Sequence, residues 1–162
     1  MKAEKDDTTV RLWGFGFYKM NKGNKIVQSL WIGSQLGTME HLSITSFLRQ
    51  GHDFHLYTYG PVGNVPEGCV IKDANKILSQ KDWNYKEFPR LALFADFFRY
   101  KLLLEKGGWW VDTDTICMRP FTFPQEYVFS SEAQRDGGIH INNGNIKAPV
   151  GSPIIQQWSS VS

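Results

Sequence analysis

The run FPRLALFADFFRYKLLLEKGGWWVDTDTICMRPF, residues 88–121, carries the clearest structural signals in the chain. Its first half predicts a helix that opens near Pro89, because proline suits the first turn of a helix. Apolar residues then recur at helical spacing. They are Leu91, Ala95, Phe98 and Leu102. Lys106 followed by Gly107-Gly108 predicts the end of this helix, and the bulky run Trp109–Val111 predicts a buried strand.

Asp112 and Asp114 follow the predicted strand directly. Residues two apart on a strand point to the same side, with Cα atoms roughly 6.6 Å apart. Two like charges placed this way repel each other unless a cation lies between them or one carboxyl is protonated. A hard divalent cation such as Mn²⁺ or Mg²⁺ relieves the repulsion and keeps coordination sites for substrate phosphates. We therefore predict a metal site in which one of the two carboxylates binds the ion directly and the other acts through water or holds a ligand hydroxyl.

The composition predicts one globular domain, since 162 residues with 41% hydrophobic content suffice to bury a core. The net charge of +2 argues against a nucleic-acid-binding surface. Cys69 and Cys117 are too few for a zinc site or a disulfide framework. No apolar run reaches the ~20 residues of a membrane span, and the first ten residues lack the apolar centre of a signal peptide. We therefore expect a cytoplasmic protein with no transmembrane segment.

Strands and helices are predicted to alternate on both sides of the central run. The strand Ile26–Ile32, the helix Gly37–Gln50 and the strand Asp53–Tyr59 form a β-α-β unit, which favours parallel strands and a right-handed crossover. Downstream, the dipeptide Asn143-Gly144 predicts a hairpin turn between two short strands within residues 138–147. The remaining predicted strands are Val70–Leu78, which ends in a turn, and Tyr127–Ser130.

Residues 92–115, ALFADFFRYKLLLEKGGWWVDTDT, resemble the core of DXD-containing glycosyltransferases with the GT-A fold. This group includes the alpha-1,6-mannosyltransferase, Gb3-synthase-like and clostridial toxin glucosyltransferase families. Their shared pattern is a small residue, Asp, two variable residues, Arg, a helix, Gly-Gly, two bulky residues and Asp-x-Asp. A lone Asp-x-Asp is a weak signal, whereas the whole pattern at this spacing is specific. The matching positions are Ala95, Asp96, Arg99, Gly107, Gly108, Asp112 and Asp114.

The resemblance covers most of the chain from Ile26 onward, and it implies both a fold and a reaction. The implied fold is α/β: a GT-A domain over residues 26–162, with a Rossmann-like mixed or parallel sheet flanked by helices, after a lead-in of residues 1–25. The implied reaction is hexosyl transfer from a UDP- or GDP-sugar to a glycan or other acceptor, with retention of configuration and with Mn²⁺ or Mg²⁺ held by Asp114 with help from Asp112. Resembling enzymes continue beyond this sequence. We therefore expect either a fragment or a shortened variant that binds the donor without a complete acceptor site.

Trp31 and Gly33 lie where the first strand of the β-α-β unit ends, and ligands bind at such strand ends in open α/β sheets. In the resembling families an aromatic ring at this position packs on the donor's base, and Gly33 would let the backbone approach the ligand. A core position is the alternative reading of Trp31.

Asp96 and Arg99 are three residues apart on the predicted helix, where an ordinary surface ion pair contributes only ~0.2–0.5 kcal/mol. The phenylalanines around them instead favour a pair that is partly buried or faces a cleft. The resemblance implies that Asp96 holds hydroxyls of the donor sugar and that Arg99 lies beside the sugar and the phosphates. It also places an asparagine beside the donor sugar, for which Asn143 and its neighbour Asn142 are the candidates.

The residues around the two aspartates also match the motif of a second enzyme class. WWVDTDTI, residues 109–116, also matches the phosphatase motif of the haloacid dehalogenases, in which the first aspartate, here Asp112, is the nucleophile. That family requires an acidic pair further downstream, and the remaining acids, Glu126, Glu132 and Asp136, form none. Glycosyl transfer is therefore our main prediction, and the alternatives are a nucleotide-sugar-binding protein without catalysis and, less favoured, this phosphatase.

Overall fold

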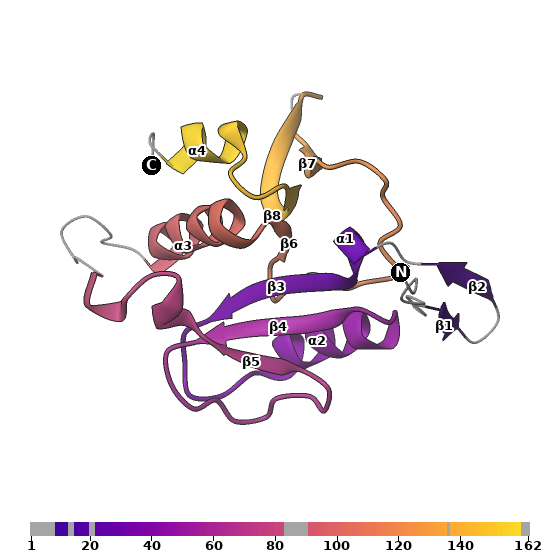
Figure 1. The fold of residues 1–162 in the computed structure, drawn as a ribbon, viewed down its shortest axis with the longest axis horizontal. Helices are drawn as coiled ribbons and strands as arrows, with labels where there is room; N and C mark the ends of the chain where they lie inside the picture. Colours follow the sequence, from indigo (N-terminus) through magenta and orange to yellow (C-terminus); the bar gives the residue numbers. More distant parts are fainter. Residues whose placement is uncertain (1–8, 13–14, 20–21, 83–90, 136, 160–162) are drawn as a thin grey trace, which may run out of the picture.

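A computed structural model describes residues 9–12, 15–19, 22–82, 91–135 and 137–159 of the chain, and within them the main feature is a six-stranded sheet (Figure 1). The strand order is β5–β4–β3–β6–β8–β7. The first four of these run parallel: β5 (Val70–Asp73), β4 (Asp53–Thr58), β3 (Ile26–Trp31) and β6 (Gly108–Val111). The last two are antiparallel to their neighbours: β8 (Ile139–Ala148) and β7 (Val128–Ala133). The predicted α/β class with a mixed, mostly parallel sheet is confirmed.

The other elements surround this sheet. Two short strands pair with each other separately: β1 (Thr9–Leu12) and β2 (Phe15–Lys19). The helices are α1 (Lys22–Lys25), α2 (Thr38–Arg49), α3 (Leu91–Lys106) and α4 (Pro153–Ser159), with 3₁₀ turns η1 (Ala74–Lys76) and η2 (Gln80–Asp82). The predicted β-α-β unit is confirmed as β3–α2–β4. The predicted helix start at Pro89 lies outside the described residues. In the described part of the chain, no helix has both the length and the apolar character that crossing a bilayer would require.

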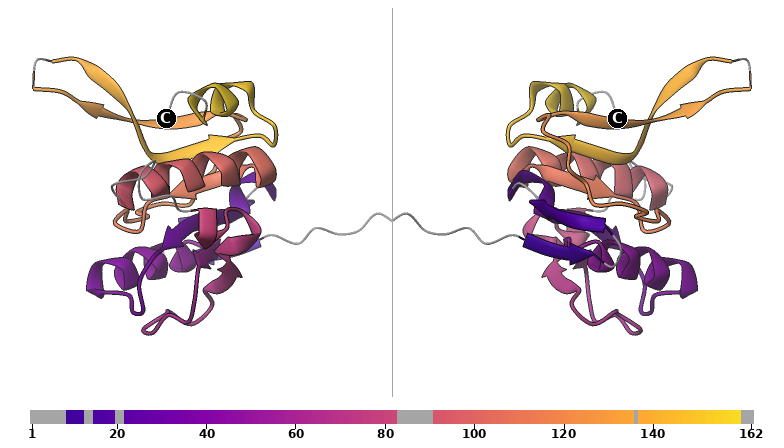
Figure 2. Two further views of the ribbon diagram at one scale, coloured as in Figure 1. Left: turned by 90° about the vertical axis from the view of Figure 1, so that its left-hand side faces the viewer. Right: turned by 90° about the vertical axis from the view of Figure 1, so that its right-hand side faces the viewer.

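Helices cover both faces of the sheet. Successive side chains of a strand point to opposite faces, so a strand with consecutive apolar residues contributes to the core on each face. The neighbours Trp109 and Trp110 on β6 therefore enter two different cores. Trp109 packs with Ile44 and Phe47 of α2, and Trp110 packs on the α3 side of the sheet, with Phe98. The distal part of the β7–β8 hairpin projects away from this layered body (Figure 2). The α3 face is the one that matters for the site, because Asp112 follows Trp110 by two residues.

The reversal between α3 and β6 depends on two glycines. Gly107 and Gly108 have φ angles of +62° and +86°, which L-residues with a side chain rarely adopt. A Cβ atom added at Gly107 would also lie 2.8 Å from the backbone nitrogen of Val150. The predicted helix stop is therefore confirmed. The tight reversal lets the chain enter the sheet as β6 while α3 packs against one face of that sheet.

Candidate functional site

Arg99 is the centre of a polar cluster at the carboxyl end of β6. Its side chain comes from α3 and is only 6% exposed, so its charge is largely removed from water. Nη2 lies 2.8 Å from Oδ1 of Asp112, and Nη1 donates a 2.6 Å hydrogen bond to the carbonyl of Asn143. Nη1 also lies 3.4 Å from Oδ1 of Asp96, one helical turn away. We call these four residues, Asp96, Arg99, Asp112 and Asn143, the Arg99 cluster.

Asp112 is held on several sides. Besides Arg99, the indole Nε1 of Trp110 donates a 2.7 Å hydrogen bond to Oδ1. The Arg99 guanidinium lies over the Trp110 ring, 4.9 Å from its centroid. Burial raises the pKa of Asp112, and the charges of Asp114 and Asp96 add to the increase, while Arg99 and the Trp110 hydrogen bond oppose it. The free oxygen is Oδ2, which has no hydrogen-bond partner among the described residues.

Asn143 completes the cluster from β8. Its Nδ2 donates to Oδ1 of Asp96 at 3.0 Å and lies 3.4 Å from the hydroxyl of Tyr100. Asp96 is therefore held between Asn143 and Arg99, with its side chain about one third exposed (32%). This arrangement differs from an ordinary surface ion pair on a helix, because both partners of Asp96 are themselves fixed by other contacts.

The prediction of a hairpin turn at Asn143-Gly144 is wrong. Both residues lie inside the single strand β8, which begins at Ile139, whereas β7 ends at Ala133 and the backbone N–H of Gln134 donates to the carbonyl of Gly138. The β7–β8 register jumps from Phe129↔Ile146 to Ser130↔Asn142, so residues 143–145 form an irregular bulge. A bulge redirects side chains near functional sites. Here it lets Asn143 point its amide at Asp96 and its carbonyl at Arg99.

The geometric premise for the two aspartates is also wrong. The strand β6 ends at Val111, and the next residues turn, since the backbone N–H of Thr115 donates to the carbonyl of Asp112 at 3.1 Å. The two carboxylates therefore do not stand two residues apart on an extended strand. Asp112 stays within the Arg99 cluster, whereas Asp114 lies exposed on the turn. The two carboxylates still interact. Burial is the main cause of the raised pKa of Asp112, and the negative charge of Asp114 raises this pKa further by a smaller amount.

The chain after this turn is anchored to α2. The buried Ser43 donates a 2.6 Å hydrogen bond to the carbonyl of Thr115. The hydroxyl of Ser46 accepts a 2.8 Å hydrogen bond from the backbone N–H of Cys117. The turn that carries Asp114 is therefore tied on one side to β8, through the Asp112 N–H and the Gly144 carbonyl at 2.8 Å, and on the other side to α2.

Removal of the Ser43 hydroxyl (Ser43→Ala) is expected to lower the free energy of unfolding by ~1–2 kcal/mol, because the carbonyl of the half-buried Thr115 loses its partner. Urea denaturation measures this change. The matched control is Thr45→Val on the same helix, because the buried Thr45 hydroxyl has no partner within the described residues. That variant is expected to be neutral or stabilising. Equal losses in both variants would contradict the role given to the Ser43 hydrogen bond.

Trp31 and Gly33 lie at the same edge of the sheet as Asp112, because β3 and β6 are parallel neighbours. Trp31 is half-buried and packs against the core on the α2 face, whereas the Arg99 cluster lies on the α3 face. Its indole Nε1 is buried without a partner in the described part of the chain. A Cβ atom at Gly33 would lie 3.0 Å from this nitrogen. The structure thus brings Asp96, Arg99, Asp112 and Asn143 together and places Trp31 and Gly33 apart from them.

Sequence reasoning missed three neighbours of the cluster. The sequence marks Trp110 only as a bulky residue of a buried strand. Its spacing of two residues from Asp112 predicts that both side chains lie on the same face of the sheet. Gly144 matters because a Cβ atom there would lie 3.1 Å from Oδ2 of Asp112 and 2.7 Å from Oδ1 of Asn142. Tyr100 follows Arg99 directly and carries no signal of its own. Asn142 lies outside the cluster and pairs with Glu132, with 3.1 Å between Nδ2 and Oε2.

Both cysteines are free, as expected from their number. Burial raises the pKa of Cys69 to about 11 and that of Cys117 to about 12. Since the thiolate is the nucleophile and the metal ligand, neither residue is suited to chemistry at neutral pH.

The residues at the turn fit a hard divalent cation. Asp112 and Asp114 offer carboxylate oxygens, which are the ligands that Mg²⁺ and similar ions prefer. Oδ2 of Asp112 is open because Gly144 has no side chain to fill the space beside it. In the described residues, no group of three or more His, Cys, Asp and Glu gathers in a metal-binding arrangement.

Known proteins are similar to this chain in sequence and in fold. Residues 21–132 match the family described as the glycosyltransferase sugar-binding region containing DXD motif. A 48-residue segment is 40% identical to the initiation-specific alpha-1,6-mannosyltransferase of Candida albicans (strain SC5314 / ATCC MYA-2876), which covers 30% of this chain and 12% of that protein.

The solved structure of the PaToxG glycosyltransferase has a similar fold, with a TM-score of 0.63 and 19% identity over 85% of this chain and 59% of that one. A transferase mutant gives a TM-score of 0.55 and 15% identity over 94% of this chain and 83% of the other. The chain thus corresponds to less than two thirds of the mannosyltransferase and of PaToxG. Because the family match covers more than half of the sequence and includes Asp96, Arg99, Asp112 and Asp114, this chain belongs to the glycosyltransferase family that contains the DXD motif.

Proposed function

We propose that this protein transfers a hexose from a nucleotide-diphosphate sugar to a glycan or another acceptor, in a metal-dependent reaction that retains the anomeric configuration. The observation that carries the proposal is the Arg99 cluster. One buried arginine there joins the first DXD aspartate, Asp112, to the pair Asp96 and Asn143 through bonds of 2.6–3.4 Å.

In this proposal each residue has a separate task. A Mn²⁺ or Mg²⁺ ion held by Asp114 and Asp112 would supply the positive charge that balances the departing diphosphate. Arg99 adds a fixed guanidinium beside the same charge, and arginine suits this because its fork binds oxyanions bidentately. Such charges stabilise a transition state best when they are positioned beforehand. The contacts of Arg99 with Asp112 and Asn143 hold it in place.

The sugar and the base would lie on either side of this charge. Asp96 is partly exposed and oriented by Asn143, so its carboxylate can accept hydrogen bonds from sugar hydroxyls. Trp31, at the end of the neighbouring strand, would pack against the base, with Gly33 allowing close approach of the backbone. In the transfer itself, the bond from the anomeric carbon to the diphosphate oxygen breaks, a bond from that carbon to the acceptor oxygen forms on the same face, and the proton of the acceptor hydroxyl passes to the departing diphosphate.

The proposal is tested by titrating the purified protein with UDP- and GDP-sugars in a calorimeter, with Mn²⁺ or with a chelator, and by measuring nucleotide release in parallel. Donor binding and release are expected only with the metal. Asp114→Asn is expected to lower the release rate by ~10²–10³-fold, as does removal of other groups that stabilise developing charge. Glu67→Gln, which changes an exposed carboxylate in the loop between β4 and β5, serves as the matched control.

Each outcome separates the candidate functions. Metal-dependent binding without release would favour the nucleotide-sugar-binding protein over the transferase. Nucleotide release that survives chelation and the Asp114→Asn change would contradict the metal assignment. A phosphate ester trapped on Asp112 would favour the phosphatase.

A further inference from the structure

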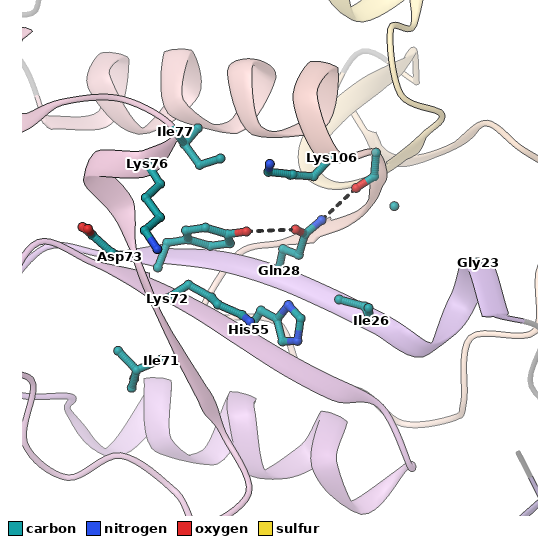
Figure 3. A pocket seen from close by; sticks show the side chains of 13 residues that line it. Gly23, Ile26, Gln28, His55, Ile71, Lys72, Asp73, Lys76, Ile77 and Lys106 are labelled. Carbon is teal, nitrogen blue, oxygen red and sulfur yellow. Dashed lines mark hydrogen bonds between the residues drawn. The ribbon is translucent and has the colours of Figure 1, made fainter.

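A cavity of about 670 Å³ lies on the α3 face of the parallel strands. Its walls come from β3, β4, β5, η1 and the end of α3 (Figure 3). It extends from Ile26 and Gly108, the first residues of β3 and β6, to Lys72 and Asp73, the last two residues of β5. The cavity shares no residue with the Arg99 cluster, so it is a feature separate from that cluster.

The charged side chains of this cavity are mostly cationic. Lys72 comes from β5, Lys76 from η1 and Lys106 from the last turn of α3, so three separate elements direct ammonium groups towards one space (Figure 3). The single acid in the lining is Asp73, whose Oδ1 accepts hydrogen bonds of 3.0 Å from the backbone nitrogen and the side-chain amide of Asn75 and whose charge also acts on Lys76. Three lysines against one carboxylate leave the lining itself with an excess of positive charge.

His55 adds to this picture from β4. Burial lowers its pKa, and the nearby positive charge of Lys72 lowers it further, against the smaller opposing effect of Asp53. The imidazole is therefore held towards its neutral form, in which it can donate or accept one hydrogen bond. It places a polar group next to Lys72 inside the cavity.

The floor of the cavity is rigid and partly apolar. The hydroxyl of the buried Tyr57 lies 3.5 Å from Oε1 of the buried Gln28, whose Nε2 donates a 2.8 Å hydrogen bond to the carbonyl of Gly107 (Figure 3). Apolar side chains complete the lining, namely those of Ile26, Ile71 and Ile77. Ile26 and Ile71 are 39% and 48% exposed, so their apolar surface is available to a ligand.

We propose that this cavity is a second binding site, for a small soluble organic molecule that carries two or more phosphate groups. Three lysines from different elements suit separate phosphates, because an ammonium binds a phosphate as a compact point charge with several donors. The apolar walls favour an organic body over an inorganic ion. The volume lies within the range of pockets for small ligands, and the low overall charge of the chain argues against a nucleic-acid polymer.

The test uses inositol trisphosphate as the soluble probe, titrated into the metal-free protein in a calorimeter with a chelator present, so that the DXD turn contributes no metal-mediated binding. Saturable binding is expected for the wild type. The double variant Lys72→Gln/Lys76→Gln is expected to weaken it by ~10-fold or more, because two of the three cationic partners are neutralised. Lys106→Gln, a milder single change, gives a second measurement should the double variant fail to fold.

Two controls locate the binding. Lys101→Gln neutralises a lysine on the same helix as Lys106 but outside the cavity, and it is expected to bind as the wild type does. Asp112→Asn is also expected to leave the affinity for the probe unchanged, which separates this site from the proposed donor site. Equal weakening by Lys101→Gln would indicate general electrostatic attraction and overturn the proposal.

Two further results would overturn the proposal as well. The first is the absence of saturable binding by the wild type. The second is binding to phosphatidylcholine vesicles that contain a phosphoinositide but not to soluble inositol trisphosphate, since this would make the ligand a membrane headgroup. Because the probe is tested without metal or donor, either failure leaves the proposed sugar transfer untouched.

Discussion

Arg99→Met is expected to lower the free energy of unfolding by about 2–4 kcal/mol and to reduce donor turnover to background. Breaking a fully buried ion pair by removing one partner costs about 3–5 kcal/mol, and we discount this because the side chain of Asp112 is 34% exposed. Methionine fills a similar volume without the charge. It therefore leaves Asp112 without its cation and the Asn143 carbonyl without its donor.

Urea denaturation of four variants measures this effect, namely Arg99→Met, Arg99→Lys, Asp112→Asn and the double variant Arg99→Met/Asp112→Asn. Arg99→Lys is the matched control, since it keeps the charge but cannot contact Asp112 and Asn143 with one planar fork. It is expected to fall between the wild type and Arg99→Met. In the double variant with Asp112→Asn, the loss is expected to be smaller than the sum of the single losses, because the two residues share one interaction. Additive losses would show that the 2.8 Å contact does not couple them.

Asp112→Asn is expected to lower the rate of sugar transfer by ~10²–10³-fold while changing the stability little. Asparagine keeps an oxygen that can accept the hydrogen bonds from Trp110 and Arg99, but it removes the negative charge that a divalent cation requires. The small effect on stability follows from two opposing changes. Burial raises the pKa of Asp112, so its charge is costly in the folded state, whereas the loss of that charge leaves Arg99 less well paired.

The rate of Asp112→Asn is measured by nucleotide release from the donor, over a range of Mn²⁺ concentrations. If the residue acts through the cation, raising the Mn²⁺ concentration recovers part of the activity. Urea denaturation of the same samples shows whether a variant has lost activity because it is unfolded. Asp112→Glu is a further control, because it keeps the negative charge on a side chain that is longer by one methylene group. Wild-type turnover by Asp112→Asn at every Mn²⁺ concentration would refute its role in the site.

Much of the fold could be predicted because its signals are local. The alternation of Asp53–Tyr59, the apolar periodicity of Gly37–Gln50 and the glycines after Lys106 each act over a few residues. The structure confirms the elements they predict, with boundaries shifted by one or two positions. Asp96, Arg99 and Asp112 could be selected through the resemblance to the DXD families, whose pattern lies within one helix, one turn and one strand.

The errors arose where a local preference competed with long-range pairing. Asn143-Gly144 is a strong turn signal, yet β8 pairs with β7 on both sides of it, at residues 139–142 and at Ile146 and Lys147, and with β6 from Asn145 to Ala148. The pairing therefore turns the dipeptide into a bulge. Likewise, the strand geometry assumed for Asp114 fails because the chain turns after Val111 and is anchored to Ser43 and Ser46 of α2, about 70 residues earlier.

The sequence by itself determined the α/β class, because helical period, strand alternation and glycine conformations depend on neighbouring residues alone. The resemblance to the DXD families indicated Asp96, Arg99 and Asp112, with Asn143 or Asn142 as a further candidate. Only the tertiary structure decided that Asn143 and not Asn142 joins the cluster, that Trp31 packs on the opposite face of the sheet, and that three lysines line one cavity. The physical reason is that these relations depend on which strand pairs with which and on the face each side chain takes. Residues distant in the chain set both.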